Sequence, residues 1–161
     1  MVDVSQIINK LQENGYSVAT AESCTGGKIA NSLVDIPGAS FVFNEGYVTY
    51  SNEAKMKNLG VKQSTLDKYG AVSKQTAVEM AMGVKERAKA DFGISSTGIA
   101  GPDGGTDKKP VGLVYIACAY GDNKCAVSKL LLKGSRNAIR DEATFAAHQL
   151  LDDCIKKLQA N

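Results

Sequence analysis

The sequence has few of the residues that build metal sites and disulfide frameworks. It contains one histidine, His148, and four cysteines among 161 residues, and no two cysteines form a Cys-x-x-Cys pair. Structural zinc sites need closely spaced cysteine and histidine ligands. No metal site is therefore expected, and buried, reduced thiols are the expected state of Cys118 and Cys154.

Strong charge and long apolar runs are also missing. The formal net charge is only +2, and no cluster of lysine and arginine is interleaved with aromatic residues. Nucleic-acid-binding surfaces concentrate basic charge, so no nucleic-acid partner is expected. No apolar run approaches the roughly 20 residues of a membrane span, and the N-terminus is predicted to be a capped helix, not a signal peptide. We therefore expect a cytoplasmic protein without a membrane partner.

What is present fits a single globular domain over residues 1–161, with alternating helices and strands. A helix capped by Asp3 and ended by Gly15 is followed by a strand at 16–21 and a helix to about Ile36. The later elements are expected to be a strand at 41–50, helices opened by Ser51, Ser64 and Ser73, strands at 92–97, 111–120 and 125–133, and a helix opened by Ser135. This order predicts an α/β fold, a three-layer α/β/α domain with a mixed, mostly parallel sheet.

The segment Ser23-Cys24-Thr25-Gly26-Gly27 joins the first predicted strand to a helix. Backbone N–H groups in the first turn of a helix lack intrahelical partners, and the helix dipole adds partial positive charge there. The segment is thus a predicted seat for a phosphate or an oxyanion, with Ser23, Cys24 and Thr25 as candidate nucleophiles.

His148 and Lys55 are the candidate bases. His148 lies in the middle of a predicted helix, where a packed or solvated histidine is far commoner than a catalytic one. Lys55 lies in the first turn of a helix, where lysine is usually solvated. To act as a base, Lys55 would need a pKa roughly 3 units below its usual value of about 10.4, which requires about 4 kcal/mol of desolvation and neighbouring charge. Ser23 and Lys55 each follow a strand end, where open α/β sheets bind ligands, and they can meet only through the fold.

Four parts of the sequence resemble the C-terminal domain of the competence/damage-inducible CinA family. They occur in the family's order and cover most of the chain, which is similar to the stand-alone form without the N-terminal domain of full-length CinA. The matching segments are Thr20–Gly27 (TAESCTGG), Tyr47–Lys55 (YVTYSNEAK), Gly70–Ser73 (GAVS), and Thr97–Gly105 (TGIAGPDGG) with Lys109–Gly112 (KPVG).

The resemblance implies a nicotinamide-nucleotide amidohydrolase, which deamidates nicotinamide mononucleotide (NMN) to nicotinate mononucleotide and ammonia in pyridine-nucleotide recycling. It implies a Ser-Lys mechanism carried by Ser23 and Lys55, with Tyr50 beside the lysine, without metal or cofactor, in a homo-oligomer. Arg136 and Arg140 match the family's Gly-x-Arg-x-x-x-Arg segment, and arginine suits a substrate phosphate. The residues expected to contact the substrate are Thr25, Gly26, Gly27, Thr97, Gly98, Gly101, Arg136 and Arg140.

Two other functions stay open at this point. A nucleotide-binding module or sensor without catalysis would use the same loops and arginines but release no ammonia. A thiol enzyme would use Cys24 and lose activity in Cys24→Ala. Within the Ser-Lys scheme Thr25 is the rival hydroxyl, and the substrate can be NMN or another nicotinamide compound such as the riboside.

Overall fold

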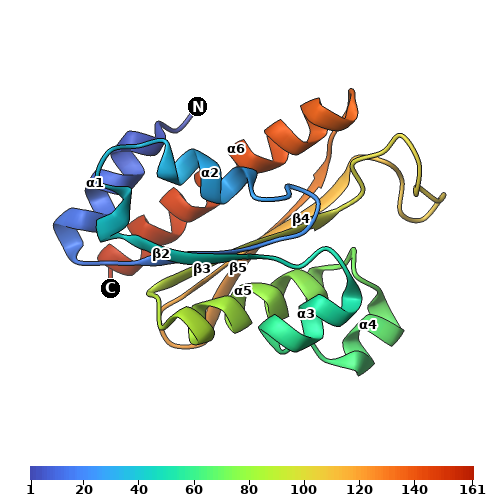
Figure 1. The fold of residues 1–161 in the computed structure, drawn as a ribbon, viewed down its shortest axis with the longest axis horizontal. Coiled ribbons are helices and arrows are strands. Elements are labelled where there is room, and N and C mark those ends of the chain that lie inside the picture. Colours follow the sequence, from blue (N-terminus) through green and yellow to red (C-terminus); the bar gives the residue numbers. More distant parts are fainter.

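The computed structural model describes residues 1–161 as a five-stranded sheet with helices on both faces (Figure 1). The strands are β1 (Val18–Glu22), β2 (Phe43–Val48), β3 (Phe92–Gly98), β4 (Leu113–Tyr120) and β5 (Lys124–Leu131). The helices are α1 (Val4–Asn14), α2 (Lys28–Val34), α3 (Asn52–Leu59), α4 (Gln63–Tyr69), α5 (Lys74–Ala88) and α6 (Arg136–Gln159), with a 3₁₀ turn η1 at Ala39–Phe41.

The sheet is mixed, with the strand order β2-β1-β3-β4-β5. β1 pairs in parallel with β2 and β3, whereas β4 pairs antiparallel with β3 and β5. Only β4 therefore runs against the other strands, and the carboxyl ends of β1, β2 and β3 meet at one edge. The predicted α/β/α architecture on a mixed sheet is confirmed.

Two helical layers enclose this sheet. Helices α1, α2 and α6 cover one face and α3, α4 and α5 cover the other (Figure 1). The larger core packs Ile7, Ile29 and Leu151 of the first layer against Phe92 and Ile116 of the sheet. None of the helices has an apolar stretch long enough to cross a bilayer.

Serine caps are found at three of the four helix starts for which they were predicted. The hydroxyls of Ser51, Ser73 and Ser135 each accept a hydrogen bond from the backbone N–H three residues later. The exception is α4, which begins at Gln63 instead of after Ser64. There the backbone N–H of Lys62 donates to a Glu79 carboxylate oxygen on α5 at 3.1 Å. A tertiary contact thus sets this helix start.

The strand expected at 41–50 is shorter than predicted. Its beginning is replaced by the 3₁₀ turn Ala39–Phe41, which Gly38 starts in the left-handed region at φ 90°. The pairing of β1 with β2 is also irregular, since the register shifts just before Thr20 pairs with Gly46.

His148 is a buried histidine of α6. Its Nε2 hydrogen-bonds to the Ser32 hydroxyl, while its Nδ1 has no partner and is closed off from solvent. Ser32 already donates to the Ile29 carbonyl. Burial lowers the pKa of His148 from 6.5 to about 4. The residue is thus a packed, neutral core histidine, one of the two ordinary states expected for it.

This histidine should make the fold acid-sensitive. Between pH 6.5 and 4 the unfolded chain binds a proton at His148 and the folded chain does not, so stability is present above this range and lost as the pH falls through it. We expect the loss to approach about 3 kcal/mol. Urea unfolding of the parent and of His148→Gln, across this range, measures it. The free energy of unfolding of the variant should fall less as the pH is lowered. An equal fall in the parent and the variant would contradict the assignment of the acid sensitivity to His148.

Candidate active site

The edge where β1 and β2 end brings Ser23 and Lys55 together. Ser23 directly follows the last residue of β1, and Lys55 lies in the first turn of α3, just beyond β2. The Lys55 Nζ lies 3.1 Å from the Ser23 Oγ and donates to the Thr49 carbonyl at 2.8 Å. These contacts place an amine beside a hydroxyl, which is the geometry that a base and a nucleophile require.

Lys55 is buried without a carboxylate. Its exposed fraction is 1%, and the three ion pairs of the chain lie elsewhere, between Lys10 and Asp152, Lys28 and Asp141, and Lys156 and Asp152. Burial lowers the pKa of Lys55 below its usual value of 10.5. The environment thus favours the neutral amine, which has a lone pair that can accept a proton.

The other two candidate nucleophiles of the turn are poorly placed. The Thr25 hydroxyl is fully buried, donates to the Glu22 carboxylate at 2.6 Å and lies 2.6 Å from the Ser96 hydroxyl. Cys24 is 4% exposed, and burial raises the pKa of its thiol to about 11, which keeps it protonated at neutral pH. Of the three, only Ser23 has the amine of Lys55 at hydrogen-bonding distance.

Glu22 is a site residue that the sequence analysis missed. Its carboxylate accepts hydrogen bonds from three backbone N–H groups at the start of α2, those of Gly27 at 3.1 Å, Ile29 at 2.9 Å and Ala30 at 3.0 Å. These three donors are therefore not open to a phosphate or an oxyanion, because an internal anion fills the position, and the role of the rest of the segment stays a prediction. The available signal was an acidic residue at the end of a strand, immediately before a helix-opening glycine turn.

Tyr50 and Arg136 meet at the rim of the site. The Tyr50 ring is 64% exposed, and its hydroxyl accepts a hydrogen bond from Arg136 Nη2 at 3.0 Å. Arg136 Nη1 donates to the Gly101 carbonyl at 2.7 Å. The Tyr50 hydroxyl is thus bonded to an arginine, and a catalytic role of Tyr50 beside Lys55 stays a prediction.

Arg140 lies one helical turn further along α6 and faces the nucleophile turn. Its Nε donates to the Cys24 carbonyl at 2.9 Å and its Nη2 to the Thr25 carbonyl at 3.1 Å. Its Nη1 is 3.5 Å from the side-chain oxygen of Asn137. Arg140 therefore contacts the backbone of the turn with two donors.

The residues at the end of β3 that were predicted to contact the substrate have structural roles within the protein. The Thr97 hydroxyl donates to the Ala71 carbonyl at 2.8 Å, which ties the loop before α5 to the sheet. A Cβ at Gly98 would lie 2.6 Å from the Val114 side chain, and Gly101 adopts a φ of +78°. Packing alone therefore requires glycine at both positions, and their contact with substrate stays a prediction.

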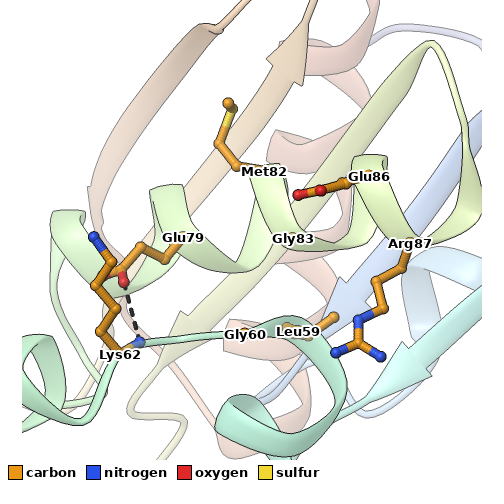
Figure 2. A pocket seen from close by; sticks show the side chains of 8 residues that line it. All are labelled: Leu59, Gly60, Lys62, Glu79, Met82, Gly83, Glu86 and Arg87. Atoms are coloured by element: carbon orange, nitrogen blue, oxygen red, sulfur yellow. Dashed lines mark hydrogen bonds between the residues drawn. The ribbon is translucent and has the colours of Figure 1, made fainter.

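The largest surface cavity lies away from this site. It has a volume of about 460 Å³ and is lined by none of the predicted site residues (Figure 2). Its walls carry both charge signs, and no buried polar atom without a partner belongs to its lining. The lining residues are Leu59, Gly60, Lys62, Glu79, Met82, Gly83, Glu86 and Arg87.

Comparison with known proteins identifies the family. The model of the CinA C-terminal domain matches residues 3–155. The chain belongs to the CinA C-terminal domain family. A CinA-like protein of Kosmotoga olearia is 55% identical over 141 residues, which make up 88% of this chain and 34% of that protein. The chain spans about a third of the length of the curated relatives it matches.

Solved structures of CinA proteins share the fold. A competence/damage inducible protein from Agrobacterium tumefaciens has a TM-score of 0.92 and 42% identity, covering 94% of this chain and 92% of that one. A CinA superfamily protein from Escherichia coli has a TM-score of 0.87 and 38% identity, covering 92% and 86%. The family predicted from the four sequence segments is confirmed.

Proposed function

We propose that this CinA domain hydrolyses the carboxamide of NMN to nicotinate mononucleotide and ammonia, with Ser23 as nucleophile and Lys55 as general base. The observation that carries the proposal is the Ser23–Lys55 pair. A buried lysine with a lowered pKa and no carboxylate partner lies 3.1 Å from a serine hydroxyl. The family resemblance supplies the substrate.

In the proposed reaction, neutral Lys55 takes the Ser23 proton while Oγ attacks the carboxamide carbon. The Thr49 carbonyl holds the Lys55 Nζ in place through its hydrogen bond. The protonated lysine then gives its proton to the amide nitrogen, the C–N bond breaks and ammonia leaves. Water, deprotonated by Lys55, hydrolyses the ester on Ser23 and frees nicotinate mononucleotide.

Arg136 is the better placed of the two arginines for the substrate phosphate. It is exposed at the rim, and its contacts with Tyr50 and the Gly101 carbonyl hold the guanidinium while leaving donors open. We place Tyr50 next to the bound substrate on the same rim. The homo-oligomer implied by the resemblance and the cytoplasmic location stay predictions.

Ammonia release from NMN, measured without added metal, tests the proposal. The purified protein should release ammonia and nicotinate mononucleotide in equal amounts. Cys24→Ala should retain turnover within about threefold, since the buried, protonated thiol has no part in the scheme. Binding of NMN without ammonia release would favour a nucleotide-binding module, and loss of turnover in Cys24→Ala would favour a thiol enzyme.

A further inference from the structure

The backbone of the nucleophile turn has a defined conformation. The Ser23 carbonyl accepts a hydrogen bond from the Gly26 N–H at 3.0 Å, which closes a turn over Ser23–Gly26. Within this turn the first residue with a positive φ is Gly26. The two central residues, Cys24 and Thr25, therefore have negative φ, which makes the turn type I. As in the first turn of a helix, the N–H groups of the two central residues then point toward the side of the Ser23 side chain.

Two backbone N–H groups of the turn have no hydrogen-bond partner. Neither the Cys24 N–H nor the Thr25 N–H has an acceptor within the protein, whereas every later donor of the turn is engaged. The engaged donors are Gly26 to the Ser23 carbonyl, Gly27 to the Glu22 carboxylate and Lys28 to the Thr25 carbonyl. The turn geometry directs this unpaired pair toward the side of the Ser23 side chain, whose attack on a carboxamide would create an oxyanion nearby.

Arg140 determines where the second of these N–H groups, that of Thr25, points. A trans peptide is planar, so the carbonyl of Cys24 and the N–H of Thr25 project in opposite directions. By binding the Cys24 carbonyl on the α6 side, Arg140 turns the Thr25 N–H away from α6. Its second bond, to the Thr25 carbonyl, fixes the next peptide, whose N–H closes the turn.

We infer that the Cys24 and Thr25 N–H groups form the oxyanion site, and that Arg140 is a positioning residue that holds the turn and aims the Thr25 N–H through its bonds to the turn carbonyls. The inference rests on the proposed function, since it assigns a role within the same site. It differs from the expected role of Arg140 as a phosphate ligand. The phosphate contact is left to Arg136, which lies on the exposed rim.

Kinetics with two substrates separate the roles of the arginines. In Arg140→Ala we expect kcat for NMN to fall by about 100-fold, as for a misaimed donor, with KM within about threefold of the parent. Nicotinamide riboside, which lacks the phosphate, should show the same fold-loss in kcat, and added guanidinium should restore part of it. The matched variant Arg136→Ala should instead raise KM for NMN by a larger factor than KM for the riboside. A rise in KM for NMN alone in Arg140→Ala would overturn the inference.

A second readout does not depend on NMN. An alkyl fluorophosphonate should label Ser23: the P–O bond to Oγ forms, the P–F bond breaks, fluoride leaves and the proton passes to Lys55. Mass spectrometry follows the rate, and Ser23→Ala is the blank. Arg140→Ala should label about 100-fold more slowly, and Arg140→Lys should lie between it and the parent, because lysine keeps the positive charge but lacks the planar fork whose separate nitrogens bind the two carbonyls.

These outcomes distinguish the inference from the proposed substrate. The inference is supported if the fluorophosphonate labels the parent and labels folded Arg140→Ala or Arg140→Lys more slowly. This holds even if the protein releases no ammonia from NMN. Equal labelling rates in the parent and both variants overturn it, whatever the result with NMN. A parent that neither reacts with the fluorophosphonate nor turns over NMN overturns the nucleophile and the inference together. Circular dichroism melts establish that each variant is folded.

Discussion

Replacing Lys55 by methionine reduces ammonia release from NMN by about 10²- to 10⁴-fold, because the general base is removed. Methionine has a similar length and no charge, so it fills the buried space, and the variant should stay folded. Lys57→Met is the matched control, since Lys57 lies on the same helix α3 but is exposed. We expect its activity to equal that of the parent. Retention of activity in Lys55→Met would remove the lysine from the mechanism.

The pH dependence of the parent adds a second test of Lys55. Only the neutral amine can accept the Ser23 proton, so kcat/KM should rise with pH and reach its plateau at a lower pH than the usual lysine pKa of 10.5 allows. The rise should be centred below 10.5, because burial lowers the pKa. A profile still rising through pH 10.5 would show an ordinary, solvated lysine.

Replacing Glu22 by alanine lowers the free energy of unfolding by about 3 kcal/mol or more. Three backbone N–H groups and the Thr25 hydroxyl lose their acceptor in a position that is 1% exposed. Glu22→Gln should cost less, because its amide oxygen still accepts hydrogen bonds while its NH₂ group faces other donors. Urea unfolding measures both losses.

Glu86→Ala is the control for this experiment. Glu86 is exposed on α5, and its carboxylate takes part in no hydrogen bond or ion pair within the protein, so its removal should change stability by no more than about 0.5 kcal/mol. If the free energy of unfolding of Glu22→Ala lies within about 1 kcal/mol of that of the parent, water replaces the carboxylate at the start of α2 at little cost. The turn would then not depend on an internal anion.

The fold could be predicted because its signals are local. Serine caps at Ser51, Ser73 and Ser135 and the helix-ending glycines Gly15 and Gly60 each act within a few residues, and they mark the ends of helices at the predicted places. The start of α4 was misplaced because Glu79 of another helix determines it. Local patterns carry no information about such a contact.

The candidate site was only partly predictable for the same reason. The strand ends suggested that Ser23 and Lys55 could converge, but the burial of Lys55 depends on packing that spacing does not reveal. The contacts of Arg140 with the turn span more than a hundred residues of sequence and exist only because α6 packs beside α2. Glu22 was missed because its one sequence signal, an acidic residue between a strand and a helix-opening glycine turn, does not show by itself that the side chain bonds to the start of the helix.

Detection of an acyl-enzyme on Ser23 tests the central claim most directly. The protein is mixed with saturating NMN, quenched in acid during turnover, digested and examined by mass spectrometry beside Ser23→Ala. The account predicts that the peptide containing Ser23 gains the mass of NMN less ammonia, with the adduct on Ser23, and that Ser23→Ala shows neither adduct nor ammonia release. An adduct on Cys24 or Thr25, or undiminished ammonia release by Ser23→Ala, would contradict it.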